Sequence, residues 1–371
     1  MKLEISTEKL KKAVLKLKNS LPDVALTQIT EHILFSIKDS VLTLKATNNQ
    51  IAIIWITQIE KSDLDFSFTI QGETLCSLVS SFTQDKITFE FNPETKDITI
   101  SCGKYVLEAS SGAVSNYPVI NIPEKLNEVK LPENFLDMLK SVYFSISNDG
   151  TKPDLNSMCI DLNKDSSEKI SLMSTDRVRL SCANAKIDFD KDKTNRFIVP
   201  KSSVAEIIKL APQYLLFSPE DSSVVYFKCE NETGTYIFRS VLTNYAYPDI
   251  YAYLSNSFKE QHYVKANKTE LINTLKRIRL TTDRTNKIGK LEFKKDNAIV
   301  SSFNSANKSK EEVTLTYESI ENIPEDFNIN IDYILEYLNQ ETENNINFKI
   351  VNKKCAIFDK DGYRHVLSIN S

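Results

Sequence analysis

The sequence predicts an α+β fold in which six similar units pair into three tandem domains, and two observations support this. Helices with apolar residues at i, i+3, i+4 and i+7 recur every 60–69 residues along the 371-residue chain. A short extended segment precedes each helix, and alternating, β-branched stretches follow it. The alternative is chance amphipathicity, but a spacing this regular favours copies of one supersecondary unit.

Each unit begins with an extended segment, and the six segments span residues 3–5, 66–70, 129–131, 196–199, 262–266 and 327–331. The apolar stripes of the helices that follow span residues 10–17, 75–82, 135–142, 204–211, 271–278 and 331–338. Residues typical of helix N-caps stand at three of the helix starts: Ser6 or Thr7, Ser202 or Ser203, and Asp332. Strands are expected after the helices, for example at 86–91 and 347–350.

One such unit cannot bury its own apolar faces, so units are expected to pair into domains with helices packed on antiparallel sheets. Pairing predicts three domains of ordinary size, at residues 1–121, 127–252 and 259–371. The boundaries fall in polar segments near 121–125 and 255–258, and a Tyr-Pro element precedes each of them.

Composition argues against the common catalytic classes. The seven glycines are scattered and form no phosphate-binding loop, and the three histidines lie far apart in the sequence. The six cysteines show no C-x-x-C pair, which favours reduced thiols in a cytosolic protein. The net charge is −4, the apolar run 51–56 is too short for a bilayer, and residues 1–5 lack the core of a secretory signal. We therefore expect a cytoplasmic protein with no metal, no cofactor and no membrane contact.

Four segments of the central third carry a resemblance to a known family: LNSM at 155–158, LMSTDRVRL at 172–180, FIVPK at 197–201 and YPD at 247–249. In this order and spacing they resemble the central domain of the bacterial sliding clamps, the β subunits of DNA polymerase III. The outer thirds match that family in length and pattern, with weaker motifs, so the resemblance extends over essentially the whole chain.

The resemblance implies three tandem DNA-clamp domains and a homodimer that closes head to tail into a ring. Such a ring encircles double-stranded DNA without reading its sequence, and acts as a processivity factor with no catalysis of its own. The implied partners are the replicative polymerase catalytic subunit, the clamp loader and repair polymerases, all bound through short linear peptides. The implied location is the cytoplasm, at replication forks of the nucleoid.

The resemblance also implies a peptide pocket between the central and C-terminal domains. The matching positions are Leu155, Thr175, Arg177, Val178, Arg179, Leu180, Pro248, Asn330, Tyr333, Val366, Leu367, Ser368 and Ile369, here called the predicted pocket residues. Leu180, Val366, Leu367 and Ile369 are expected to form an apolar floor, and Arg179 and Asn330 to bind polar groups of the peptide. The chain departs from the family's usual residues at Arg177, Val178, Ala252 and Ser368, so its peptide preference is expected to differ.

Basic residues on the helices suggest a DNA-facing surface, although a solvated helix face is an alternative. The candidates are Lys9, Lys12, Lys16, Lys152, Lys201, Lys209 and Lys276. For the dimer interface, the resemblance implies that Tyr105 and Leu107 on an edge strand of one subunit face Leu280 of the other.

Two further hypotheses remain open from the sequence. The first is an interaction scaffold of the same fold that has lost DNA encirclement, because the loops expected to touch DNA carry Val24 and Asp149. The second is a hydrolase that uses carboxylates such as Asp161 and Asp176, which would have to lie together in a cleft.

Overall fold

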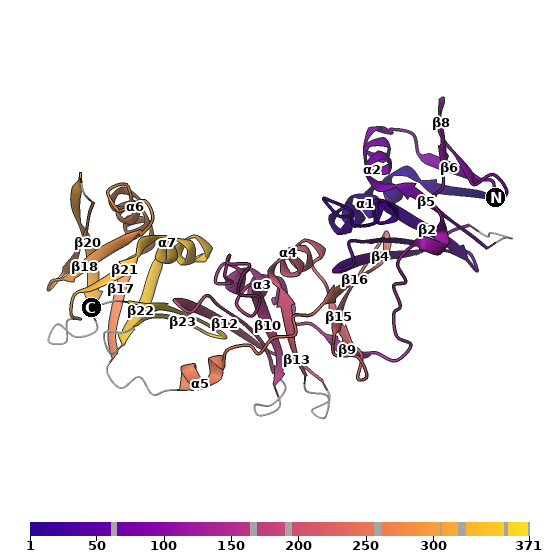
Figure 1. Cartoon of the computed structure of the whole chain (residues 1–371). Helices are drawn as coiled ribbons and strands as arrows, with labels where there is room; N and C mark the ends of the chain where they lie inside the picture. Colours follow the sequence, from indigo (N-terminus) through magenta and orange to yellow (C-terminus); the bar gives the residue numbers. More distant parts are fainter. Residues whose placement is uncertain are drawn as a thin grey trace. The chain divides into compact units, whose positions relative to one another are not determined.

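The computed structural model describes residues 1–60, 65–163, 169–189, 195–255, 261–304, 306–317, 324–351 and 355–369. The strands of this part form three antiparallel sheets, of four, eight and twelve strands (Figure 1). The chain divides into two compact units, residues 1–133 with 202–242 and residues 134–201 with 243–371. The four- and eight-stranded sheets belong to the first unit and the twelve-stranded sheet belongs to the second. Within the described ranges, no helix is both long and apolar enough to span a bilayer.

Six repeats of strand, helix and three-stranded antiparallel meander follow one another along the chain, which confirms the predicted series. Repeat 1 consists of β1 (Lys2–Ser6), α1 (Thr7–Leu17), β2 (His32–Lys38), β3 (Val41–Thr47) and β4 (Ile51–Gln58). Repeat 2 consists of β5 (Phe66–Gln71), α2 (Gly72–Ser81), β6 (Lys86–Phe91), β7 (Asp97–Cys102) and β8 (Tyr105–Ser110). Repeat 3 consists of β9 (Asn127–Lys130), α3 (Phe135–Tyr143), β10 (Ser157–Asn163), β11 (Lys169–Thr175) and β12 (Arg179–Lys186). Repeat 4 consists of β13 (Asn195–Pro200), α4 (Lys201–Leu210), β14 (Tyr214–Phe217), β15 (Val224–Asn231) and β16 (Gly234–Val241). Repeat 5 consists of β17 (Gln261–Asn267), α6 (Lys268–Arg279), β18 (Ile288–Phe293), β19 (Asn297–Phe303) and β20 (Lys308–Tyr317). Repeat 6 consists of β21 (Phe327–Asn330), α7 (Ile331–Gln340), β22 (Asn345–Val351), β23 (Cys355–Lys360) and β24 (Tyr363–Ser368).

The helices form where the apolar stripes predict them. In α1 the stripe residues Leu10, Ala13, Val14 and Leu17 are all buried, because their spacing places them on one side of the helix. The Oγ of Ser6 accepts a hydrogen bond from the N–H of Lys9, so Ser6 rather than Thr7 is the N-cap.

Two of the predicted caps are wrong. Helix α4 begins at Lys201, directly after β13, so Ser202 and Ser203 lie inside the helix. The N-cap of α7 is Asn330, whose Oδ1 accepts hydrogen bonds from the N–H groups of Asp332 and Tyr333. The strand-to-helix turn therefore lies two to three residues earlier than the cap chemistry alone suggests.

The repeats interlock in pairs by exchanging their first strands. In the first pair, β5 lies beside β2 and β1 lies beside β6. The same exchange places β13 beside β10 and β9 beside β14, and places β21 beside β18 and β17 beside β22. Each repeat thus completes the sheet of its neighbour, which explains why a single repeat could not fold alone.

The last strands of the repeats join neighbouring pairs into longer sheets. Strand β4 pairs antiparallel with β16, and β12 pairs antiparallel with β24. Helices α3 and α7 lie on the same face of the resulting twelve-stranded sheet: the Tyr363 hydroxyl donates to the Ser141 carbonyl, and the ring of Tyr337 stacks on His365. Because side chains alternate along a strand, residues 363 and 365 of β24 face the same side.

A short helix, α5 (Ile250–Ser255), was not predicted. The side chain of Asp249 accepts a hydrogen bond from the N–H of Ala252 and so caps its start. Ile250, Tyr251 and Leu254 pack with Leu180, Cys182, Val366 and other apolar residues of the twelve-stranded sheet. With six residues, α5 is too short to show the apolar periodicity by which the other helices were identified.

Candidate functional site

The predicted pocket residues gather around the turn between β11 and β12. The hydroxyl of Thr175 accepts from the N–H of Arg177 (3.0 Å) and donates to the carbonyl of Arg179 (2.7 Å). The Oδ1 of Asp176 accepts from the N–H groups of Val178 (3.0 Å) and Arg179 (2.9 Å). These bonds fix a turn in which Arg177 has a φ of 78° and Val178 is 44% exposed. The turn therefore presents two side chains outward on a rigid backbone.

Arg179 is buried and makes its polar contacts within the chain. Its Nε donates to Asp176 Oδ2 (3.0 Å), and its Nη1 donates to Glu336 Oε2 of α7. The guanidinium lies over the ring of Tyr333 at 4.3 Å and near that of Phe144 at 5.6 Å. Sequence reasoning missed Glu336, which lies 157 residues away and carries no local motif.

The four residues expected to form one apolar floor lie in two places. In the β12–β24 ladder Arg179 is opposite Leu367, and Leu180 is opposite Val366. Adjacent residues of a strand point to opposite faces, so Leu180 and Val366 share the face covered by α5. Leu367 and Ile369 instead pack into the cluster that contains α6 and α7 residues.

The remaining predicted pocket residues have mainly structural contacts. Asn330 caps α7, as described above, and the N–H of Ser368 donates to the carbonyl of Val178 at 2.8 Å. Leu155 is buried, Pro248 is half-buried, and Ser368 is exposed. The structure thus brings most of these residues to the ends of β12 and β24, with Arg177, Val178 and Ser368 accessible to solvent.

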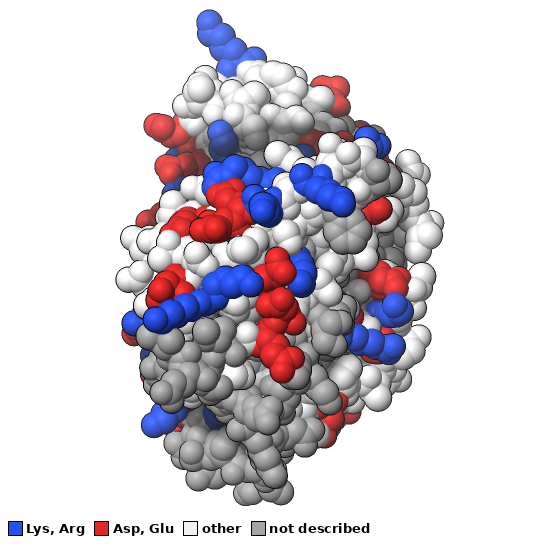
Figure 2. All heavy atoms as spheres, turned by 90° about the vertical axis from the view of Figure 1, so that its left-hand side faces the viewer, with Lys and Arg blue, Asp and Glu red and all other residues white. Residues whose placement is uncertain are grey.

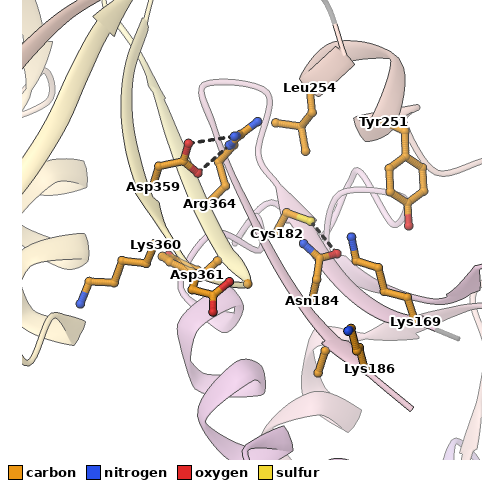
Figure 3. Close-up of a pocket in the computed structure, with 13 residues that line it drawn as sticks. Lys169, Cys182, Asn184, Lys186, Tyr251, Leu254, Asp359, Lys360, Asp361 and Arg364 are labelled. Atoms are coloured by element: carbon orange, nitrogen blue, oxygen red, sulfur yellow. Dashed lines mark hydrogen bonds and ion pairs between the residues drawn. The ribbon is translucent and has the colours of Figure 1, made fainter. Parts of the chain in front are cut away.

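A cavity of about 540 Å³ lies further along the face of Leu180 and Val366 (Figure 3). Its lining includes Cys182 and Arg364, two residues along their strands from Leu180 and Val366, together with Tyr251 and Leu254 of α5. None of the predicted pocket residues is among those that line it. Both Arg364 Nε and Nη2 donate to Asp359, each at 2.8 Å, and this pairing raises the pKa of Arg364.

The lysines proposed to face DNA are largely paired. Lys12 bonds Glu8 (2.9 Å) and Glu232 (3.2 Å), and these partners raise its pKa. Lys16 lies over the ring of Tyr236, at 4.8 Å from its centroid. Lys152 pairs with Asp149 at 3.0 Å and Lys209 pairs with Glu206 at 2.7 Å.

Lys201 has a structural role: its Nζ donates to the carbonyl of Ile146 (2.9 Å) and to Asn148 Oδ1 (2.7 Å). Lys276 is exposed and forms no ion pair within the described ranges, and Lys9 is half-buried. On the face shown in Figure 2, basic and acidic side chains of the described residues are interspersed rather than gathered by sign.

The residues expected at the dimer interface are accessible. Tyr105 is 41% and Leu280 is 80% exposed, and Leu107 is half-buried on the edge strand β8. Val106, beside them on β8, is exposed as well.

The two carboxylates considered for a hydrolase have separate arginine partners. Asp161 accepts from Arg196 Nη2 at 2.8 Å, and Asp176 accepts from Arg179 and from the turn backbone. Carboxylates held this way are ion-pair and turn-stabilising groups, and the structure gives no support to a catalytic pair made of these two residues.

Two protein-family models match the chain. The model of the DNA polymerase III beta subunit N-terminal domain matches residues 1–122, and the model of the central domain of the same subunit matches residues 130–249. The beta sliding clamp of Chlamydia muridarum is 22% identical over 79% of this chain and 78% of that protein. The beta sliding clamp of Helicobacter pylori is 24% identical over 91% of this chain and 88% of that protein.

Solved structures show the same fold. The DNA polymerase III subunit beta from Pseudomonas aeruginosa superposes with a TM-score of 0.87 at 15% identity, over 100% of this chain and 99% of that one. The DNA polymerase sliding clamp from Bacillus subtilis gives a TM-score of 0.86 at 18% identity, over 100% and 99% of the two chains. The three tandem domains of helices on antiparallel sheets are thus those of the clamp fold.

Proposed function

Because the chain belongs to the DNA polymerase III beta subunit family, we propose that it is a sliding clamp, a processivity factor of the replicative DNA polymerase. Two copies close into a ring around double-stranded DNA, and the ring tethers its partners to the template. The chain then works as an accessory subunit, and its contribution to synthesis is topological rather than catalytic. It acts at replication forks in the cytoplasm, where the nucleoid lies.

The observation that carries this proposal is the pairing of last strands between repeats. The last strands of repeats 1 and 4, β4 and β16, pair with each other, and so do the last strands of repeats 3 and 6, β12 and β24. The last strands of the two other repeats, β8 of repeat 2 and β20 of repeat 5, have no such partner among the described strands. In the described part of the chain β8 pairs only with β7, and residues 308–314 of β20 pair only with β19. By the same rule, β8 of one copy pairs with β20 of another. A head-to-tail contact of this kind, made twice, closes a dimeric ring.

The same strand exchange supports a division into domains at residues 1–121, 127–252 and 259–371, because each of them would hold one interlocked repeat pair. The helices on one face of each sheet then form the inner, DNA-facing layer. Lys276 is the candidate that we assign to a loose phosphate contact, because it is exposed and has no ion pair in the described part of the chain, whereas the other candidates are paired or half-buried.

The partners bind through short peptides at the turn that carries Arg177 and Val178. We assign direct contact with the peptide to the predicted pocket residues that are accessible. The buried ones hold the accessible ones in position. The partner classes are the polymerase catalytic subunit, the clamp loader and repair polymerases.

Ring closure is tested by light scattering and by retention on DNA. The chain should run at twice its mass of 42.3 kDa. After loading by a clamp loader with ATP, the labelled chain should stay on nicked circular plasmid in high salt and leave when a restriction enzyme linearises the plasmid. Equal loss from circles and linear DNA would instead favour a scaffold that does not encircle DNA.

Peptide binding is tested by fluorescence polarisation with a labelled peptide whose anchors are glutamine, two leucines and phenylalanine. Leu180→Asp is a poor probe because Leu180 is buried and the charge would disturb the core. Val178→Asp changes an exposed residue instead, and Val24→Asp is the matched control because Val24 is 86% exposed outside the predicted pocket. Micromolar binding, lost in the first variant and kept in the second, is expected.

A further inference from the structure

The cavity of Figure 3 has a floor of strand residues and one apolar wall. Lys169, Cys182, Asn184 and Lys186 come from β11 and β12, and α5 contributes Tyr251 and Leu254. Its volume of about 540 Å³ falls within the range of about 300–1,000 Å³ that is usual for ligand sites. The cavity therefore has room for a few residues of an extended peptide.

Two lysines face each other at one side of this cavity. Lys169 and Lys186 are direct partners in the β11–β12 ladder, so their side chains lie on the same face. Like charges directly opposite one another destabilise a sheet. Within the described ranges neither lysine forms an ion pair, so their charges are not compensated as those of Lys12 or Lys209 are.

The other charged residues of the lining already have partners, with one exception. Arg364 is held by Asp359, and Lys360 is held by Glu341 and by Glu343 (3.1 Å). Asp361 is the exception and lies at the hairpin turn, beside Lys360 and apart from the two lysines (Figure 3). The uncompensated charge of the cavity is therefore positive and is concentrated at Lys169 and Lys186.

We infer that this cavity binds an acidic segment next to the anchor residues of a partner peptide. The inference rests on the proposed function, because the peptide anchors would bind at the β11–β12 turn, further along the same two strands. Carboxylates of the peptide pair with Lys169 and Lys186, and an apolar side chain packs on Tyr251 and Leu254. The cavity thus selects partners whose binding motif continues into acidic sequence.

The location favours a peptide over nucleic acid. Side chains of β12 alternate between the two faces of the sheet, and every second one points to α3 and α7. The β12 residues that point to the other face are Leu180, Cys182, Asn184 and Lys186. The cavity therefore opens on the face opposite those helices. The proposed DNA-facing layer is the helical one. An apolar wall beside two cations also suits a peptide with mixed side chains better than a phosphate backbone.

The test uses three labelled peptides that share the glutamine, leucine and phenylalanine anchors. One is neutral on both sides, one has three aspartates before the anchors, and one has three aspartates after them. Polarisation titrations compare the unchanged chain with K169E/K186E, with K169R/K186R and with K294E/K295E. The last variant is the matched control, because it makes the same charge change at two exposed lysines of the β18–β19 turn. Circular dichroism melts check that each variant is folded.

One of the acidic peptides should bind the unchanged chain about tenfold tighter than the neutral peptide, and added salt should reduce the difference. K169E/K186E should abolish this preference and leave the neutral peptide unaffected, whereas K169R/K186R and K294E/K295E should retain it. If neither acidic extension improves binding while the neutral peptide binds, the inference is overturned and the proposed function stands. If the neutral peptide does not bind, the proposed peptide pocket itself fails. If K169E/K186E weakens binding of a DNA oligonucleotide and not of the peptides, the cavity is a nucleic-acid site and the inference is wrong.

Discussion

The imidazole of His365 on β24 lies parallel to the ring of Tyr337 on α7, with centroids 5.1 Å apart and an interplanar angle of 0°. The ring of Phe144 packs on it at 5.0 Å, and Ser181 Oγ lies 2.8 Å from its Nδ1. Burial, together with the positive charge of Arg179, lowers the pKa of His365 to about 3. The imidazole is therefore neutral at physiological pH, and it packs between the β12–β24 ladder and the helices above it.

This burial makes stability depend on pH. In the unfolded chain a histidine takes up a proton near pH 6.5, whereas folded His365 does so only near pH 3. Between these values the unfolded state binds more protons, so the free energy of unfolding falls as the pH is lowered, by about 1.4 kcal/mol per pH unit from this residue. Urea unfolding at pH 7.5, 6 and 5 measures the slope.

His365→Asn is the diagnostic variant, because Asn keeps a hydrogen-bonding group for Ser181 but does not titrate. Its unfolding free energy should be lower at pH 7.5 and should change less between pH 7.5 and pH 5. His32, whose pKa is also lowered by burial, contributes in the same direction in both proteins and cancels in the comparison. Parallel pH profiles for the two proteins would refute the assignment.

The sequence predicted the six helices because each carries a stripe of apolar residues that the sheet buries. It could not predict which first strand completes which sheet, because the exchange of β1 and β5 depends on contacts between distant segments. It also treated Leu180, Val366, Leu367 and Ile369 as one floor. The register of β12 against β24 separates them, and a one-residue difference in register is invisible without the ladder.

Charge pairing at the site was equally hidden. The bond from Arg179 to Glu336 joins segments 157 residues apart, and the pair of Lys169 with Lys186 depends on the β11–β12 register. The lysines of α1 were visible in the sequence, but the ion pair of Lys12 with Glu232 was not. Local periodicity thus predicts elements well, whereas the ionic partners of a site follow from tertiary structure.

Arg177→Gly should stabilise the chain. Arg177 has a φ of 78°, in the left-handed region where a Cβ is unfavourable. Relief of this strain outweighs the added freedom of the unfolded chain, and we expect a gain of about 1 kcal/mol in the free energy of unfolding.

Val178→Gly is the control for that substitution, because Val178 is not among the residues with positive φ. The free energy of unfolding of this variant should be lower by roughly 0.5–1 kcal/mol, because glycine gives the unfolded chain more conformational entropy. Thermal melts of both variants give the comparison, and a loss of stability in Arg177→Gly would contradict the strain argument.

The cap of α7 gives a further test. Asn330 accepts hydrogen bonds from the N–H groups of Asp332 (2.9 Å) and Tyr333 (3.4 Å), so Asn330→Ala should cost about 1 kcal/mol of stability. Asn330→Ser should keep most of this stability, because serine can also accept the hydrogen bonds of an N-cap. Asp332→Asn, which removes the partly exposed ion pair with Arg279 and a carboxylate from the first turn of α7, should cost about 0.5 kcal/mol. Equal effects of Asn330→Ala and Asp332→Asn in chemical unfolding would argue against Asn330 as the cap.

Leu280→Asp should convert the proposed dimer into a monomer. Leu280 directly follows α6, is 80% exposed in the isolated chain, and is expected to be covered by β8 of the other copy. Burying a leucine contributes roughly 2 kcal/mol, and the ring has two equivalent interfaces, so the substitution counts twice. A total of about 4 kcal/mol corresponds to a roughly 1,000-fold increase in the dimer dissociation constant. Light scattering over a dilution series measures it, with Leu26→Asp as the control because Leu26 is 90% exposed outside the proposed interface. If both variants stay dimeric at the concentrations where the unchanged chain does, the interface does not include Leu280; if both dissociate, the effect comes from added charge and not from a specific contact.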